Sequence, residues 1–424
     1  MLAVAAGVTL LLAPQIGAVL AADHSPEAVS TRLASRPFTH DNDLMAIFIA
    51  APQVGWPQVW RWLVSGDWID VSGGGPFWRP VVSALWWAEY QLFGQDFLLY
   101  NLVSIALVAL TCGLLAGGLA AWTGELLLGV AAAGFLWWRT TTTLSGVLDW
   151  FPAQTDLLAG LGAAAAFYLV AVGLRAQGPL RRGLLAGSLA CYLLATLAKE
   201  SVIAFPLGAA ALLWWGLGRR SLPWIGAYGL LGLALVAGRT LILGGIGERV
   251  VLAGSLHLLH RAAVVLAGNW LGVAVVGWQS LGSLLLVAPL VLAVVRPGLL
   301  RRRAVAYGLV GVIPVLLVLL AHHYHGSALV LLLPVVWGQL WGGVVYLACA
   351  LLLVWRRRRQ AAVLACLAVA LSAQLVLGRY WGMPYYHYVY NIACAAMNGL
   401  VVAAVWELVR AWGRRLLGPQ AAAG

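Results

Sequence analysis

Residues 98–121, LLYNLVSIALVALTCGLLAGGLAA, run for 24 positions without a charged side chain. A helix needs about 20 apolar residues to cross the hydrocarbon core of a bilayer. Such a run must be helical in lipid, because its backbone N–H and C=O groups have to be satisfied within the segment. The whole chain is similar, with 62% hydrophobic and 9% charged residues and a mean hydropathy of +0.91. This composition excludes a soluble globular protein and predicts an all-α polytopic membrane protein.

Apolar runs recur along the chain, and we predict about twelve transmembrane helices. The first run also resembles a signal peptide, because Val19–Ala22 forms a small-residue cleavage pattern, but no basic residue precedes it. In either case residue 23 emerges on the outer side. The predicted helices are 1–22, 98–121, 125–138, 157–174, 183–198, 201–217, 222–243, one within 262–295, 304–321, 327–354, 360–377 and 392–411.

The charges are distributed unequally between the two sides of these helices. Sixteen arginines but only two acidic residues, Glu125 and Glu407, fall on the side with short loops, against ten basic and twelve acidic residues on the other. The positive-inside rule makes the arginine-rich side cytoplasmic. The net charge of +12 therefore indicates topology and attraction to anionic membrane lipids, and not nucleic-acid binding. We expect a bacterial inner (plasma) membrane protein.

The chain divides into four parts: a first transmembrane helix (1–22), an extracytoplasmic loop (23–97) and two transmembrane modules (98–243 and 244–424). The loop is long and rich in tryptophan, unlike a disordered linker. Its segments 57–64 and 80–93 predict short helices with aromatic faces on the membrane interface. This structured loop is therefore a candidate part of a functional site.

Polar residues gather on the outer side at two short segments. The stretch 38–45, FTHDNDLM, contains His40, Asp41 and Asp43 shortly after the first apolar run. Lys199, the only lysine in the chain, stands beside Glu200 in a turn between two predicted helices. The lysine indicates either a specific role for an ammonium group or a surface ion pair of little energetic value.

A third outer segment, residues 378–391, is dense in tyrosine. These side chains can stack on a sugar or a prenyl chain, or they can form the aromatic belt of a membrane interface. Arg379 in this segment and Arg239 near the end of 222–243 add positive charge on the same side. The tyrosines are Tyr385, Tyr386, Tyr388 and Tyr390.

Four motifs, in order, resemble the GT-C membrane glycosyltransferases, relatives of the tetratricopeptide-containing membrane mannosyltransferases. Residues 77–94, FWRPVVSALWWAEYQLFG, and 100–103, YNLV, are similar to the family's aromatic-Arg-Pro helix and the start of its second span. Residues 146–159, GVLDWFPAQTDLLA, and 197–201, LAKES, are similar to its Asp-Leu-Leu-Ala and Lys-Glu stretches. The resemblance implies a GT-C-like fold and transfer of a sugar from a polyprenyl-phosphate-type donor.

The resemblance also implies roles for individual residues. Asp41 takes the position of the catalytic base, with Asp43 as its alternate, and Arg79 and Lys199 match further family positions. Two residues depart from the pattern: Asn101 stands where the family often has His, and Gln154 where it often has Arg. We assign supporting positions to His40, Glu200, Asp156 and Tyr386. No tetratricopeptide tail follows the last predicted span.

Sugar transfer from a lipid phosphate needs one base at the acceptor hydroxyl and cations at the departing phosphate. Lys199 and Arg79 are the candidate phosphate ligands, with Arg239 and Arg379 as helpers. His40, Asp41 and Asp43 also provide mixed ligands for a divalent cation, although three ligands in one open run do not require one. The acceptor, whether glycan, lipid or protein, is not indicated.

Two other functions fit the same residues. A transporter or flippase of lipid-linked sugars would need polar residues along a path through the membrane, and the predicted spans contain few ionisable groups. A non-catalytic membrane subunit that binds polyprenyl lipids would tolerate loss of both Asp41 and Asp43. The enzyme alone forms a covalent product, and the transporter is distinguished from the binding subunit by translocation of the substrate.

Overall fold

The computed structural model describes residues 55–61, 63–65, 78–142, 148, 153–244, 352–353, 355–377 and 388–417, and every regular element in these ranges is a helix. The predicted spans 1–22, 304–321 and the one within 262–295 lie outside the described residues, as does most of 327–354. The twelve-span count therefore stays a prediction, as do the boundaries of the four parts.

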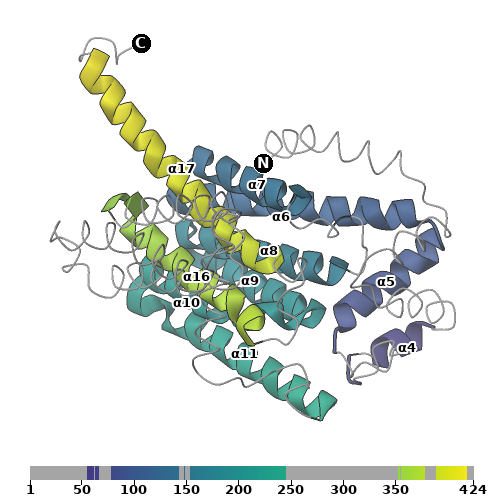
Figure 1. Ribbon diagram of the computed structural model, residues 1–424. Coiled ribbons are helices and arrows are strands. Elements are labelled where there is room, and N and C mark those ends of the chain that lie inside the picture. The colour runs from purple at the N-terminus through teal and green to yellow at the C-terminus, as the bar shows by residue number, and fades with distance from the viewer. Residues whose placement is uncertain are drawn as a thin grey trace, which may run out of the picture.

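The helices agree closely with the apolar runs (Figure 1). Two short helices precede the bundle, as predicted, and the predicted spans between residues 98 and 243 all correspond to helices. The elements are α4 (Trp56–Arg61), α5 (Pro80–Phe93), α6 (Phe97–Thr123), α7 (Leu126–Thr142), α8 (Gln154–Arg175), α9 (Gly178–Ala198), the 3-10 turn η3 (Glu200–Val202), α10 (Phe205–Leu217), the 3-10 turn η4 (Gly218–Ser221), α11 (Leu222–Leu243), α16 (Arg358–Leu377) and α17 (Tyr388–Leu417).

Among the residues that the structure describes, five stretches are long and apolar enough to cross a membrane, so the chain is a membrane protein. The fourth stretch, of 44 residues, folds into two helices, α10 and α11, that turn at η4. With 17 residues, α7 is shorter than the others. The five stretches are Phe97–Thr123, Gln154–Arg175, Gly178–Ala198, Glu200–Leu243 and Tyr388–Trp412.

Consecutive helices run in opposite directions, because the turns between them are short. Gly124 ends α6 in a left-handed conformation, φ 85°, and its N–H binds the Ala120 carbonyl at 2.9 Å. The chain then reverses within two residues into α7 (Figure 1). As a result, residues far apart in sequence reach the same end of the bundle. Arg79, Asp156, Lys199 and Arg239 lie at one end, and Arg175, Arg219, Arg220 and Arg357 lie at the other.

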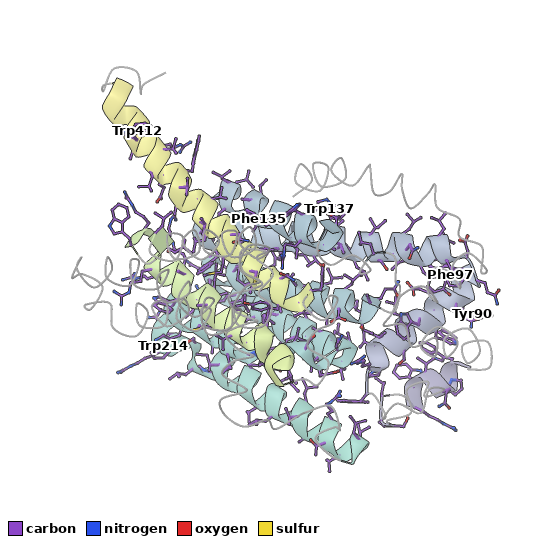
Figure 2. All side chains as sticks on the ribbon, in the orientation of Figure 1. Tyr90, Phe97, Phe135, Trp137, Trp214 and Trp412 are labelled. Carbon is purple, nitrogen blue, oxygen red and sulfur yellow. The ribbon has the colours of Figure 1, made fainter. Side chains whose placement is uncertain are left out.

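Large side chains point both inward and outward from the bundle (Figure 2). Phe97 and Trp137 are buried between helices, whereas Trp214 and Trp412 are exposed on the outside. Exposed apolar surface on this scale is typical of a protein whose flanks contact lipid. The interior is closely packed where small residues meet: Gly399 of α17 lies against Leu128 and Ala132 of α7.

Candidate functional site

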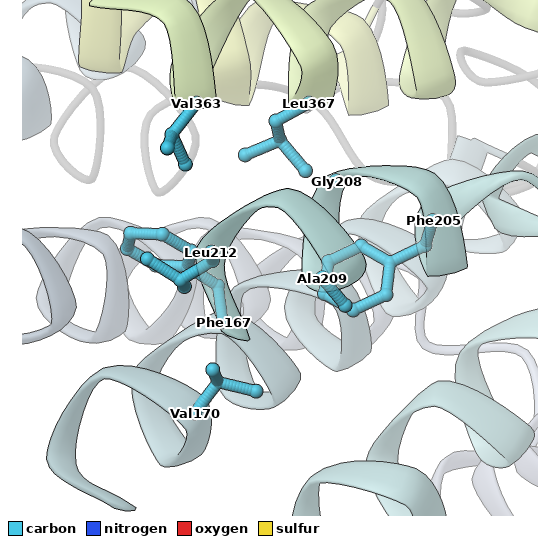
Figure 3. Close-up of a pocket in the computed structure, with 8 residues that line it drawn as sticks. All are labelled: Phe167, Val170, Phe205, Gly208, Ala209, Leu212, Val363 and Leu367. Atoms are coloured by element: carbon cyan, nitrogen blue, oxygen red, sulfur yellow. The ribbon is translucent and has the colours of Figure 1, made fainter. Parts of the chain in front are cut away.

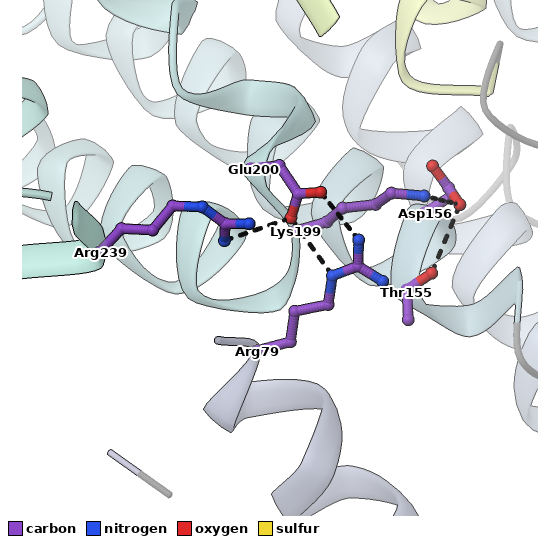
Figure 4. A network of polar contacts seen from close by, with 6 residues as sticks. All are labelled: Arg79, Thr155, Asp156, Lys199, Glu200 and Arg239. Atoms are coloured by element: carbon purple, nitrogen blue, oxygen red, sulfur yellow. Dashed lines mark hydrogen bonds and ion pairs between the residues drawn. The ribbon is translucent and has the colours of Figure 1, made fainter. Parts of the chain in front are cut away.

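Six polar side chains lie together as two adjoining groups, one around Glu200 and one around Asp156, which we call the ion-pair cluster (Figure 4). They come from four separate parts of the chain: the residue before α5, the first turn of α8, the turn between α9 and α10, and the last turns of α11. The antiparallel arrangement of the helices brings these parts to one end of the bundle. The members are Arg79, Thr155, Asp156, Lys199, Glu200 and Arg239.

Glu200 is bound by two arginines. The Arg79 guanidinium donates from Nη2 to Oε1 at 2.8 Å and from Nε to Oε2 at 3.2 Å, which is the bidentate geometry that makes such pairs strong. Nη1 of Arg239 lies 3.5 Å from Oε2 of Glu200. Glu200 therefore ties the start of α5 to the end of α11.

Lys199 is buried and is paired with Asp156. Its Nζ lies 2.5 Å from Oδ2 of Asp156, and the two side chains are 1% and 0% exposed. Thr155 Oγ1 also donates to Oδ2 of Asp156, at 3.3 Å. Burial lowers the pKa of the Lys199 ammonium to about 8, although the Asp156 carboxylate opposes this shift. The alternative of a surface ion pair between Lys199 and Glu200 is wrong, because these adjacent side chains bind different partners.

The local backbone explains why the two side chains separate. Lys199 ends α9 in an extended conformation, φ −161° and ψ 142°, and Glu200 begins a helical turn immediately afterwards. Asp156 lies in the first turn of α8, where the helix dipole favours a negative charge. Pro206 then stands in the first turn of α10, a position where its missing N–H costs nothing.

A second polar group fixes α5 against α8 and α6. Trp86 Nε1 donates to Oε1 of Gln154 at 2.9 Å, and Gln154 Nε2 donates to Oε1 of Glu89 at 3.0 Å and to the Tyr100 carbonyl at 3.2 Å. Burial raises the pKa of the Glu89 carboxyl to about 8, and the Gln154 hydrogen bond reduces this shift. Sequence reasoning did not select Glu89. The sequence feature that could have indicated Glu89 is a single acidic residue within a predicted helix rich in aromatic residues.

The remaining predicted site residues divide into two groups. Tyr388 and Tyr390 are 0% and 2% exposed, so their predicted role in sugar stacking or in an interfacial belt is wrong, because both fill the helix core. The other group lies outside the described residues, and its predicted roles stay predictions. This group is His40, Asp41, Asp43, Arg379, Tyr385 and Tyr386.

Two other kinds of site can be compared with the ion-pair cluster. Within the described ranges, no group of three His, Cys, Asp or Glu side chains is placed to hold a metal, so a divalent cation stays a prediction for His40, Asp41 and Asp43. One pocket, of about 10 Å³, lies between α8, α10 and α16 (Figure 3). Its volume suits about one water molecule, and its lining has no polar side chain. The lining residues are Phe167, Val170, Phe205, Gly208, Ala209, Leu212, Val363 and Leu367.

Comparisons with known protein families, curated proteins and solved structures found no match for this chain. The glycosyltransferase resemblance therefore depends on the four quoted motifs. The first and the last of these supply Arg79, Lys199 and Glu200, which meet in the ion-pair cluster. The third supplies Asp156 to the cluster and Gln154 to the neighbouring group.

Proposed function

We propose that the chain is a membrane glycosyltransferase of the GT-C type, which transfers a sugar from a polyprenyl-phosphate-type donor to an acceptor hydroxyl on the extracytoplasmic face. The observation that supports this most is the meeting of Arg79, Lys199 and Arg239 at one end of the bundle. All three are cations, the side chains that bind phosphate groups. The four motifs and their order support the same reaction.

The charge of the cluster suits an anionic donor. Three cations and the two carboxylates of Asp156 and Glu200 leave one net positive charge when Lys199 is protonated. The carboxylates also hold the cations in place before a ligand arrives. Cations fixed in this way stabilise the charge that develops on a leaving phosphate without a further cost of reorganisation.

The reaction also needs a base at the acceptor hydroxyl, and we propose Asp41, with Asp43 as the alternate. The base removes the hydroxyl proton as the acceptor oxygen attacks the anomeric carbon, and the carbon–phosphate oxygen bond breaks to release polyprenyl phosphate. Attack from the face opposite the phosphate inverts the anomeric centre. Both aspartates belong to the extracytoplasmic loop that also carries Arg79.

The test uses the purified full-length chain in lipid nanodiscs. Its readouts are binding of polyprenyl phosphate and release of polyprenyl phosphate from a panel of polyprenyl-phosphate-linked sugars, with a membrane extract as the acceptor. Arg239→Gln should weaken binding by about 10- to 100-fold, since charge-assisted hydrogen bonds contribute roughly 1.5–3 kcal/mol. Asp41→Asn should leave binding intact and abolish turnover.

The control is Arg182→Gln, an exposed arginine at the opposite end of the bundle, which should change neither readout. Full turnover by the Asp41→Asn and Asp43→Asn variants would contradict the base assignment. Binding without turnover by the unmodified chain would favour the non-catalytic subunit. Movement of the donor across liposome membranes without a covalent product would favour the transporter.

A further inference from the structure

The end of the bundle opposite the ion-pair cluster has its own ionic centre. Arg357, just before α16, binds Glu125 through both terminal nitrogens, with Nη2 2.8 Å from Oε2, and Nη2 also lies 2.6 Å from Oε1 of Glu407 in α17. The Arg357 side chain is only 8% exposed. This centre joins the turn before α7 to the two C-terminal helices.

The ionic centre uses the acidic residues at this end. Among the acids that the structure describes, Glu125 and Glu407 are the two located here, and Arg357 binds both. The neighbouring arginines are exposed. With one guanidinium and two carboxylates, the centre itself carries one net negative charge, and the exposed arginines around it outnumber that charge. The exposed arginines are Arg356, Arg358, Arg359 and Arg410.

Two of these arginines lie over exposed tryptophans. The Arg356 guanidinium carbon is 4.0 Å from the centroid of the Trp355 ring, and that of Arg410 is 5.1 Å from the Trp406 ring. The two tryptophans are 67% and 44% exposed. Each pair adjoins a partner of the ionic centre in sequence, because Trp355 and Arg356 precede Arg357 and Trp406 precedes Glu407. The Arg357–Glu407 contact therefore brings both pairs to the same region.

We infer that this surface, formed by Trp355, Arg356, Trp406 and Arg410, binds the headgroup of an anionic phospholipid. The two guanidinium groups provide the charge that attracts the phosphate. The tryptophan rings suit the boundary between headgroups and acyl chains, where Trp is enriched in membrane proteins. A free phosphate ion would use the arginines but gain nothing from the exposed rings. This site is at the far end from the proposed glycosyltransferase site and does not depend on it.

The geometry of α17 supports this location. The helix begins at Tyr388 near the site end, and its last turns project past the rest of the bundle (Figure 1). Trp406 and Arg410 are one turn apart and share a face of the helix. Val405 and Val409 are also exposed beside them. A face that carries both an arginine and exposed apolar side chains suits contact with a phospholipid, which has a charged headgroup and apolar chains, better than contact with water alone.

The test measures phosphatidylglycerol and phosphatidylcholine binding to the full-length chain in dodecyl maltoside micelles by native mass spectrometry. We expect a preference for phosphatidylglycerol, and about 30-fold weaker binding in Arg356→Gln/Arg410→Gln, since each of the two arginines near an anionic surface contributes about 1 kcal/mol. Trp355→Leu/Trp406→Leu should also bind several-fold more weakly. The matched control, Arg182→Gln, should bind like the unmodified chain.

Equal binding of the two lipids would overturn the inference, as would unchanged affinity in the double arginine variant or an equal loss in the Arg182→Gln control. Displacement of the lipid by millimolar inorganic phosphate would also overturn it, because the surface would then be a simple anion site. Circular dichroism checks folding. If the glutamine variant does not fold, the tryptophan variant decides the matter, and unchanged affinity there would overturn the inference.

Discussion

At the scale of single residues, Glu89 combines a buried carboxyl with a neutral partner. Its Oε1 accepts from Gln154, while Oε2 is buried without a hydrogen bond in the part of the chain that the structure describes. A carboxylate in this place would lose hydration without gaining a cation. Glu89 is therefore held as the neutral acid near pH 7, which agrees with its raised pKa of about 8.

The raised pKa of the Glu89 carboxyl makes the free energy of unfolding depend on pH. The pKa of Glu89 in the folded state lies above its unfolded value near 4.5. Its contribution to the free energy of unfolding is therefore fully present below pH 4.5 and is lost as pH rises through about 8. We expect Glu89→Gln to be more stable than the unmodified chain at pH 9, by a few kcal/mol. Thermal unfolding between pH 5 and 9 measures this difference.

The control for this prediction is Asp96→Asn, which changes an exposed acid just before α6 and keeps a side chain able to cap the helix. Its unfolding curve should follow that of the unmodified chain at each pH. Parallel pH profiles for Glu89→Gln and the unmodified chain would show that Glu89 does not titrate in this range.

The lowered pKa of Lys199 predicts a second pH effect, which acts on donor binding. With a pKa of about 8, its positive charge declines between pH 7 and 9, so affinity for polyprenyl phosphate should fall over this interval. The ligand itself stays doubly charged, since the second pKa of a phosphate is near 6. Binding should be measured in the Glu89→Gln background, which removes the other group that titrates near pH 8. An affinity that does not change with pH in that background would contradict a role for Lys199 in donor binding.

At the scale of elements, the contact between α7 and α17 depends on a glycine. A Cβ atom at Gly399 would lie 2.5 Å from the Leu128 carbonyl oxygen and 3.0 Å from the Ala132 nitrogen, and backbone atoms cannot move aside. We therefore expect Gly399→Ala to destabilise the protein by about 1–3 kcal/mol. Thermal unfolding in detergent measures the loss.

Gly134→Ala provides the matched control, because it lies within α7 and a Cβ there meets no atom within 4 Å. This substitution should be neutral or stabilising, since alanine favours a helix by about 1 kcal/mol over glycine. Equal unfolding midpoints for the two variants would contradict the proposed close contact.

The helices themselves could be predicted from the apolar pattern. The run 222–243 matches α11 residue for residue, and 80–93 matches α5, because Pro80 starts the helix and Gly94 ends it. Differences occur at helix ends: α9 begins at Gly178 instead of 183 and α10 at Phe205 instead of 201, and α17 begins four residues before the predicted 392. There, tyrosine and asparagine continue the helix, because they are buried in the protein rather than placed in water.

At the scale of the whole molecule, hydropathy predicts which side of the membrane a residue occupies but not its neighbours. Arg79, Lys199 and Glu200 were selected from the sequence, and they do lie together. Asp156 and Arg239 were also selected, but which side chain pairs with which was not predicted, because the pairing of Lys199 with Asp156 spans 43 residues and depends on how the helices pack. For the same reason, the contact between Glu125 and Arg357, 232 residues apart, left no local signal.

The ionic groups at the two ends of the bundle have a consequence for helix register. Apolar helices surrounded by lipid tails gain little from one depth over another, since the tails are as apolar as the side chains. If α11 slid along its neighbours by one turn, about 5.4 Å, Arg239 would leave Glu200; the same slip in α17 would separate Glu407 from Arg357. Charges at opposite ends of the bundle thus fix the depths of α11 and α17 in the assembled protein. Apolar contacts between the helices and the lipid tails do not.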